Sequence, residues 1–313
     1  MDQIDILILR YEGAMQSAIL GLEEMFMLAN KLQSDNPSKV LFCVQTDTGI
    51  SNEQTPRIVI VPPCVEDSRY TEVPDALIDQ LSASHQRGSV LCSVCAGAFL
   101  LARTGLLHRR PATTHWFLTE DFKTQFPTVL LDANKILIDD GDLITAGGLM
   151  AWLDLGLELV ARFGNPALMR QLGKHLVVDT APREQRYYRR FIPRLNHGDR
   201  AILKAQHWLQ RQFSEPVSIT ALADLTHLSE RTFQRRFAKA TGETPSHYVQ
   251  QLRIAKACDQ LESGTDTVEK IASTVGYEDV SAFRKTFVRI TGLTPRGFRQ
   301  RFNPLPTHKN PDA

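Results

Sequence analysis

The chain has few cysteines and no long apolar run, which argues against a disulfide-rich secreted protein and against a membrane-spanning one. Its 313 residues hold five cysteines, an odd number scattered along the chain, which is not the framework of a disulfide-stabilised secreted domain. No apolar stretch reaches about 18 residues, the length that a membrane-spanning helix needs. No secretory leader opens the sequence either. We therefore expect a cytoplasmic protein without a membrane partner.

Motifs for a metal or a nucleotide cofactor are missing as well. No cysteine and histidine pairs occur at the spacing of zinc ligands. No glycine-rich loop of the kind that holds phosphates is present. We therefore expect neither a metal nor a cofactor.

The net charge is small, yet its distribution is uneven. The whole chain carries a formal net charge of only +1, whereas residues 200–303 contain 16 lysines and arginines against 10 aspartates and glutamates. An excess of positive charge in one region is typical of a domain that faces phosphates. At this length we expect two domains, of which the C-terminal one is basic.

The C-terminal third contains one pattern twice. Phe233 recurs fifty residues later as Phe283. Ile219 recurs after only forty-nine residues, as Val268, so the second copy has a turn that is one residue longer. Each copy has two short helical segments separated by a tight turn, which predicts a helix-turn-helix unit.

The second helix of each copy is predicted to contact DNA, and we call it the reader helix. In the first copy, Ser218 and Ser229 are placed to cap the two helices, while Phe233 and Phe237 form the buried side of the reader helix. Its open face then presents Arg231, Gln234 and Arg235. Arginine pairs with guanine and glutamine with adenine in the major groove, so this face has the chemistry of direct base recognition.

The second copy follows the same plan, and its reader helix presents Ser281, Arg284 and Lys285. Between the copies, a helix is predicted to start at Pro245 and to end before Gly264. About 17 helical residues span roughly 25 Å, which suits two readers in successive major grooves of double-stranded DNA, about 34 Å apart. The alternative is a helical bundle with a solvated basic face, which the duplication disfavours.

This region resembles the AraC/XylS family of transcription regulators. The resemblance implies an all-α DNA-binding domain with two helix-turn-helix units. The residues that carry it are Ala223, Leu228 to Phe237, Gly242, Pro245, Arg253, Ala257, Ile271 to Gly276, Phe283, Phe287, Gly292, Pro295 and Phe298.

The first 180 residues alternate between strand-like and helix-like runs. This alternation predicts an α/β fold with a mainly parallel sheet covered on both faces. We expect this domain over residues 1–180, a linker over 181–198, the basic domain over 199–303 and a disordered tail over 304–313. Tyr187, Tyr188 and Phe191 indicate that part of the linker packs against a neighbour.

The run SVCAG, residues 93–97, marks the sharpest candidate site of the first domain. A strand ends at Val94, small residues allow a tight turn, and a helix follows, so Cys95 is predicted to lie on an elbow-like turn at the carboxyl edge of the sheet. The start of a helix favours a thiolate, and we expect a lowered pKa for Cys95. Two alternatives remain open: a buried structural cysteine, and a redox pair with Cys92.

This domain resembles the DJ-1/PfpI superfamily, in the branch joined to AraC-type domains. The resemblance implies a flavodoxin-like parallel sheet and a ligand pocket at Cys95, Ala96, Glu24 and His115. A lone histidine next to a tryptophan is more often a packed, hydrogen-bonded core residue, and this interpretation of His115 stays open. The residues that carry the resemblance are Tyr11, Gly13, Gly21, Glu24, Phe26, Cys95, Gly97 to Leu101, Gly105 to Leu107, Ala112 to Trp116, Ala146, Gly147 and Asp154.

The chain departs from the enzymes of that superfamily around the cysteine. Ala18 stands where they place an acidic residue, and Ala96 stands where the protease-type members have histidine. A Pro62-Pro63 pair also replaces their usual glycine pair. These departures favour a pocket that senses a ligand over one that catalyses a reaction.

Together these features predict a homodimeric transcription regulator that responds to a small molecule. The resemblance implies a nitrogen-containing metabolite such as an amino acid, carnitine or betaine, and RNA polymerase is a candidate partner. One alternative is a cysteine-dependent amidase, glyoxalase or protease-like enzyme that uses Cys95. Another is a DNA-binding protein whose first domain serves only for dimerisation.

Overall fold

The chain forms two compact units. The computed structural model describes residues 2–33, 39–51, 55–66, 69–181 and 183–303. Unit 1 comprises Met1–Arg186 and unit 2 comprises Tyr187–Ala313. The tail expected to be disordered, residues 304–313, lies outside the described residues.

Unit 1 is built on a six-stranded sheet with the order β2-β1-β3-β4-β8-β7. Neighbouring strands are parallel except for β7, which pairs antiparallel with β8 at one edge. The predicted mainly parallel α/β sheet is therefore confirmed. The strands are β1 (Asp2–Leu9), β2 (Val40–Asp47), β3 (Ile58–Val61), β4 (Val90–Val94), β7 (Leu137–Asp139) and β8 (Leu143–Ala146). A small separate sheet pairs β5 (Pro111–Ala112) with β6 (Leu130–Leu131).

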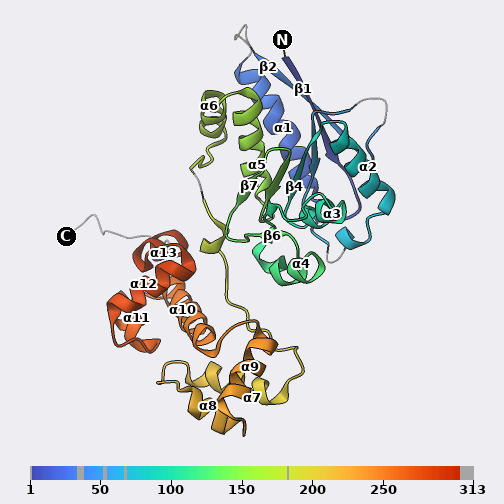
Figure 1. The fold of residues 1–313 in the computed structure, drawn as a ribbon. Coiled ribbons are helices and arrows are strands. Elements are labelled where there is room, and N and C mark those ends of the chain that lie inside the picture. The colour runs from blue at the N-terminus through green and yellow to red at the C-terminus, as the bar shows by residue number, and fades with distance from the viewer. Residues whose placement is uncertain (1, 34–38, 52–54, 67–68, 182, 304–313) are drawn as a thin grey trace, which may run out of the picture. The chain divides into compact units, whose positions relative to one another are not determined.

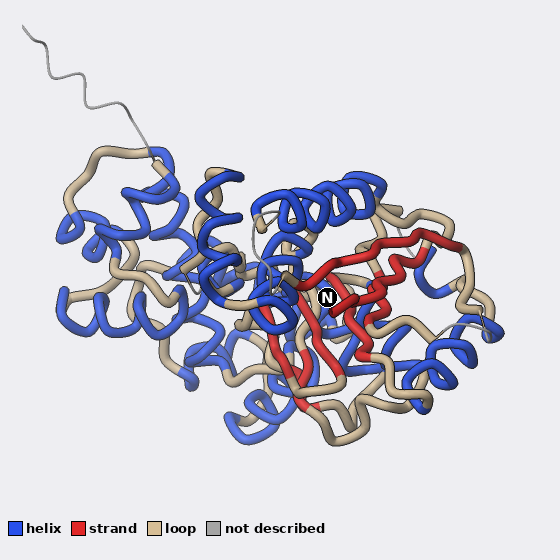
Figure 2. Tube along the Cα trace, turned by 90° about the horizontal axis from the view of Figure 1, so that it is seen from above, coloured by secondary structure: helices blue, strands red, loops and turns tan. Residues whose placement is uncertain are grey.

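Helices cover both faces of the large sheet (Figures 1 and 2). One face carries α1 (Gln16–Leu32), α5 (Trp152–Leu159) and α6 (Pro166–Leu176), and the other carries α2 (Asp75–Gln86) and α3 (Gly97–Arg103). Each layer has its own apolar core, so every residue of β3 and β4 is buried. This double burial explains why both strands read as continuous apolar runs.

Shorter elements complete unit 1. A Cβ at Gly21 of α1 would lie 2.4 Å from the Trp152 ring, so only glycine lets α1 and α5 approach this closely. The helix α4 spans Thr119–Gln125, and α5 continues as one π-helical turn, Val160–Gly164. Single 3-10 turns lie at Arg69–Thr71, Trp116–Leu118 and Gln185–Tyr187.

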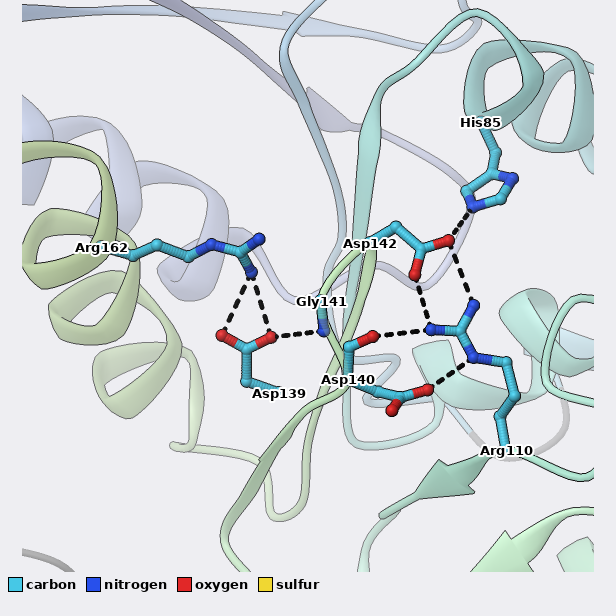
Figure 3. A network of polar contacts seen from close by, with 7 residues as sticks. All are labelled: His85, Arg110, Asp139, Asp140, Gly141, Asp142 and Arg162. Atoms are coloured by element: carbon cyan, nitrogen blue, oxygen red, sulfur yellow. Dashed lines mark hydrogen bonds and ion pairs between the residues drawn. The ribbon is translucent and has the colours of Figure 1, made fainter.

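An ionic network holds the turn between β7 and β8 (Figure 3). Arg110 donates from Nε to the Asp140 carboxylate at 2.5 Å and from Nη2 to the Asp142 carboxylate at 2.6 Å. His85 Nε2 lies 2.5 Å from the second oxygen of Asp142. The hydrogen bond from Arg110 holds the pKa of Asp142 well below its usual range, and the contact with His85 adds to this shift. The network lies where β8 begins, at the end of the sheet opposite Cys95, so it serves the fold.

Asp142→Asn should lower the free energy of unfolding at pH 7 by about 1 kcal/mol, a modest loss because nearly half of the side chain is exposed. A carboxylate with a lowered folded pKa adds stability that is fully present above its unfolded pKa, about 3.9. This contribution is lost as the pH falls through the folded pKa. Thermal unfolding should show the difference from wild type narrowing below about pH 4.

The control for this prediction is Asp79→Asn, at an exposed residue in the middle of α2. It should leave the midpoint of unfolding unchanged at every pH. A difference between wild type and Asp142→Asn that stayed constant from pH 6 to pH 3 would contradict the assigned role of the carboxylate.

Unit 2 is all-α, with helices α7 (Arg200–Gln212), α8 (Ile219–Leu225), α9 (Glu230–Thr241), α10 (Pro245–Ser263), α11 (Val268–Thr274), α12 (Val280–Thr291) and α13 (Pro295–Phe302). The predicted caps are confirmed: Ser218 accepts from the N–H of Ala221 at 3.0 Å, and Ser229 from that of Thr232 at 3.3 Å. Four residues separate α8 from α9 and five separate α11 from α12, which confirms the longer second turn.

The start of unit 2 packs on its helices. The Phe191 ring lies edge-on to Tyr248 at 5.0 Å, and the Tyr188 ring edge-on to Phe302 at 5.5 Å. The expectation that part of the linker packs is therefore confirmed. Within the described ranges, none of the helices combines the length and the apolar character that a bilayer crossing requires.

Candidate ligand site and nucleic-acid interface

Cys95 occupies a strained turn between a buried strand and a helix. Its φ is 55°, in the left-handed region that a residue with a side chain seldom adopts. Its backbone N–H donates to Ala146 at 2.7 Å, and its carbonyl accepts from Thr114 Oγ1 at 2.8 Å. A Cβ at Gly97 would lie 2.7 Å from the carbonyl oxygen of Val61, so the helix starts directly against β3. The predicted elbow is confirmed.

The predicted low pKa of Cys95 is wrong. Burial raises the pKa of the Cys95 thiol to about 12 and outweighs the hydrogen bond from the backbone of Ala96, which acts in the opposite direction. The side chain is almost entirely enclosed, and α3 has only seven residues. The cost of desolvating the thiolate is therefore larger than the stabilisation that the start of the helix gives it. Cys92 is also a free, fully buried thiol whose pKa burial raises.

Two neighbours of Cys95 escaped the sequence analysis as site residues. Tyr11 Oη donates to the Pro62 carbonyl at 2.6 Å. Burial raises the pKa of Tyr11 well above its usual value, and the nearby Cys64 and Cys95 raise it further. Tyr11, Cys64 and Cys95 therefore lie close together at the carboxyl edge of the sheet. In the sequence, Cys64 was one of the scattered cysteines. Only the proline pair before it, directly after β3, could have indicated that it lies at the edge of the sheet.

Of the other predicted pocket residues, Ala96 and His115 are buried or partly buried, whereas Glu24 is exposed. Ala96 is buried beside Cys95 at the start of α3. His115 Nδ1 accepts from the N–H of Phe117 at 3.1 Å, and burial lowers the pKa of His115. Glu24 lies on an exposed face of α1, about 12 Å along the helix from its first residue. The side chain of Glu24 is therefore exposed, whereas that of Cys95 is buried.

A buried glutamine at the end of unit 1 was also missed. Gln185 is 2% exposed, and its Nε2 donates to the carbonyls of Thr114 and Lys135, both at 2.8 Å. Its Oε1 accepts from the N–H of Trp116 at 3.1 Å. Thr114 in turn binds the Cys95 carbonyl, so the last residues of unit 1 connect to the Cys95 turn through one loop. Sequence reasoning placed this glutamine in a linker, where nothing signals burial.

Cys95 should be unreactive at neutral pH. With a pKa of about 12, roughly one thiol in ten thousand is ionised at pH 8, and the thiolate is the reactive form. Alkylation by iodoacetamide, followed by mass spectrometry of the peptide, should be slow at pH 8 and should still accelerate above pH 10. The same thiol in guanidinium-unfolded protein is the control and should react readily. Fast alkylation of folded protein at pH 7 would contradict the assignment.

The first reader helix, α9, has the predicted division of faces. Phe233 and Phe237 are fully buried. Arg231, Gln234 and Arg235 are exposed, and no hydrogen bond or ion pair to them occurs within the described ranges. The next residue, Arg236, is different: it forms two hydrogen bonds, of 2.9 and 2.7 Å, with Asp199 at the start of α7. Three polar side chains of α9 are thus available to a partner, while Arg236 serves the fold.

The second reader helix, α12, also exposes its predicted residues, but its arginines have partners. Ser281, Arg284 and Lys285 are exposed. Arg284 forms a 2.7 Å ion pair with Glu269 of α11. Arg289, one turn further on, donates to Gln250 of α10 at 2.8 Å. Arg284 and Arg289 are thus already engaged inside unit 2, unlike the polar side chains of α9 named above.

Metal ligands are not grouped in the parts of the chain that the structure describes. No cluster of three histidine, cysteine, aspartate or glutamate side chains occurs there.

Comparisons with known proteins match both units. Residues 36–162 match the DJ-1/PfpI family, and residues 222–301 match the family described as helix-turn-helix domain. The HTH-type transcriptional regulator CdhR of Pseudomonas aeruginosa is 27% identical over 216 residues, which are 69% of this chain and 64% of that protein. The HTH-type transcriptional regulator GbdR of the same species is 26% identical over 260 residues, 82% of this chain and 70% of that protein. The chain thus spans 64% to 70% of the length of these relatives.

A solved structure is similar to unit 1. Drosophila melanogaster DJ-1beta shares 16% identity at a TM-score of 0.46, with coverage of 57% of this chain and 100% of that one.

Proposed function

Because the chain joins a DJ-1/PfpI domain to an AraC-type helix-turn-helix domain, we propose that it is a transcription regulator that binds specific double-stranded DNA and responds to a small molecule. Unit 2 binds the DNA and unit 1 binds the effector. Both relatives described above are named as HTH-type transcriptional regulators, which supports this proposal.

One observation favours sequence-specific binding above all. The exposed face of α9 presents two arginines and a glutamine without partners in the described structure, on a helix anchored by two buried phenylalanines. Side chains held in this way can form paired hydrogen bonds to base edges. On α12 the arginines already have partners, and long cations grip phosphate as readily as guanine. We therefore assign most of the base specificity to α9.

Arg235→Ala should weaken binding to the preferred site by about 1–3 kcal/mol and relax the preference at one base pair. The preferred site comes from selection of a random duplex library by the wild-type chain. Binding is then measured by fluorescence anisotropy at one fixed salt concentration, since phosphate contacts make affinity depend on salt. A uniform loss on all sequences, with the preference unchanged, would show that α9 does not read bases.

Arg236→Ala is the matched control, one residue further along the same helix. It removes the ion pair with Asp199, which lowers the pKa of that carboxylate, so it should reduce thermal stability. The selected sequence should stay the same. If Arg236→Ala changed the base preference as Arg235→Ala does, the division between a reading face and a structural face would be wrong.

The Cys95 turn is our candidate for the effector site. It lies at the carboxyl edge of the sheet, where open α/β sheets bind ligands. The high pKa of its thiol disfavours nucleophilic attack. We therefore prefer a sensor to an amidase, glyoxalase or protease-like enzyme. Nitrogen-containing metabolites such as amino acids, carnitine or betaine are the first ligands to test. A true effector raises the unfolding temperature of wild type because it binds only the native state.

Within unit 1, hydrogen bonds connect the Cys95 turn to the last residues of the unit. Thr114 binds the carbonyl of Cys95, and Gln185 binds the carbonyl of Thr114. Arg183 adds two hydrogen bonds to Asp154 of α5, at 2.8 and 2.5 Å. A ligand that moves the Cys95 turn would therefore disturb the residues that lead into unit 2. This arrangement supports control of DNA binding by the effector, and RNA polymerase is a further candidate partner of such a regulator.

We also propose a homodimer formed through unit 1. The helix α1 exposes Leu20 and Met27, with 52% and 61% of their surface accessible, on the face that includes Glu24. Two large apolar side chains two turns apart on one exposed helix face favour a symmetric contact.

The full chain should have twice the 35.2 kDa mass of one copy in light scattering at micromolar concentration. Leu20→Arg combined with Met27→Arg should return it to a monomer, because the charges oppose burial of this face. Val177→Arg, at a residue that is 90% exposed after α6, is the control and should remain dimeric. A wild-type monomer would refute the dimer, and a dimer that survives the double substitution would exclude α1 as its interface.

A further inference from the structure

The helix α10 belongs to both halves of unit 2. Its first half packs Tyr248 and Leu252 into the core that contains α8 and α9. Its second half packs Ile254 and Ala257 into the core that contains α11 and α12. Arg253 therefore lies at the point of α10 where the buried residues change from one core to the other.

The guanidinium of Arg253 binds backbone carbonyls from both halves. Nε donates to Phe213 at 2.7 Å and Nη2 to Glu215 at 2.9 Å, both in the segment between α7 and α8. Nη1 donates to Gly276 at 2.8 Å, in the turn between α11 and α12. The guanidinium also lies 5.6 Å from the centre of the Tyr277 ring. The planar fork of the guanidinium places a separate nitrogen at each of the three carbonyls.

Close backbone contact strengthens this joint. Gly276 has a φ of +84°, and a Cβ there would lie 2.3 Å from the Ser214 carbonyl oxygen, so the turn can approach that segment only as glycine. Phe213 packs against both cores. The hydrogen bond from Arg289 to Gln250 is a second link between α12 and α10.

Next to the joint, the two halves are separated by open space. A groove of about 660 Å³ is lined from the first half by residues such as Val217 and Val249, and from the second by Tyr277 and Ala282. Arg253 also lines this groove. Side-chain packing does not fill the space between the halves there, so the polar joint adds to the shared helix α10 and to Phe213 in holding their relative orientation.

We propose that Arg253 is a positioning residue that sets the distance and rotation between α9 and α12, and thereby makes the protein selective for the spacing of its two half-sites. A half-site is the set of base pairs that one reader helix contacts. One inserted base pair moves the second half-site by about 3.4 Å and rotates it by about 35°. A rigid joint cannot follow this change, whereas a loosened joint can. The inference rests on the proposed function, because it requires that both readers engage one duplex.

The test uses the full-length protein and the duplex that wild type selects from a random library. Versions of this duplex carry zero, one or two extra base pairs between the half-sites. Wild type should lose on the order of tenfold in affinity for one inserted base pair, comparable to a single mismatch. Arg253→Ala should bind the original duplex more weakly, yet lose no more than about threefold on insertion. Footprints should still cover both half-sites.

Two further variants separate positioning from general destabilisation. Arg253→Lys keeps the charge, but its three donors sit on one nitrogen and cannot reach carbonyls that the guanidinium contacts with three separate nitrogens, so it should also tolerate the insertion. Arg236→Ala destabilises the first half without touching the joint, so it should keep the wild-type spacing preference.

The possible results distinguish this inference from the proposed function. A folded Arg253→Ala or Arg253→Lys protein with the wild-type spacing penalty would overturn the inference alone. The same relaxed spacing in Arg236→Ala would also overturn it, because loss of stability would then explain the effect. A wild-type protein that enriches no sequence would overturn the proposed function itself, and the inference with it.

Discussion

The fold of unit 2 depends on the packing of four helices, α8, α9, α11 and α12, in cores that share α10. The helices α8 and α11 have seven residues each, too few to be stable in isolation. Their stability comes from burial of phenylalanine pairs against α10 and its neighbours: Phe237 meets the Tyr248 ring edge-on at 5.2 Å, and Phe287 meets Phe298 at 5.5 Å. Because both cores share one helix, neither reader helix can change its orientation without a change at α10. The relative orientation of α9 and α12 therefore depends on packing against α10.

In unit 1 the corresponding constraint is burial at the carboxyl edge of the sheet. The Cys95 turn has the backbone of a nucleophile elbow, and its strained φ is held by hydrogen bonds to Ala146 and Thr114. Its side chain, however, is enclosed, so the thiol is neutral where an enzyme would need a thiolate. One turn can thus keep the backbone shape of a catalytic elbow while burial keeps its thiol protonated. The buried Gln185 satisfies backbone groups of Thr114 and Trp116, in the loop whose Thr114 side chain binds the carbonyl of that turn.

Arginine has three separate roles in unit 2, and its surroundings decide among them. Arg235 is exposed and has no partner in the described structure, which leaves it available to a base. Arg236 is fixed by an ion pair with Asp199. Arg253 is half-buried and binds three carbonyls. Nothing in the residue type separates these roles, and helical periodicity separates only the first two.

The sequence alone determined the local structure: the alternating strands and helices of unit 1, the duplicated units and their caps at Ser218 and Ser229, and the elbow at Cys95. These features depend on patterns within about 20 residues, where periodicity, capping and turn chemistry act directly. Tertiary structure decided the neighbours, the burial and the pKa of the site residues, because these depend on groups that are distant in the chain. It brought Tyr11 and Cys64 beside Cys95, left Glu24 exposed and buried Gln185. It also reversed the predicted shift in the pKa of Cys95, because desolvation depends on every atom packed around the thiol, whereas the helix that follows it is visible in the sequence.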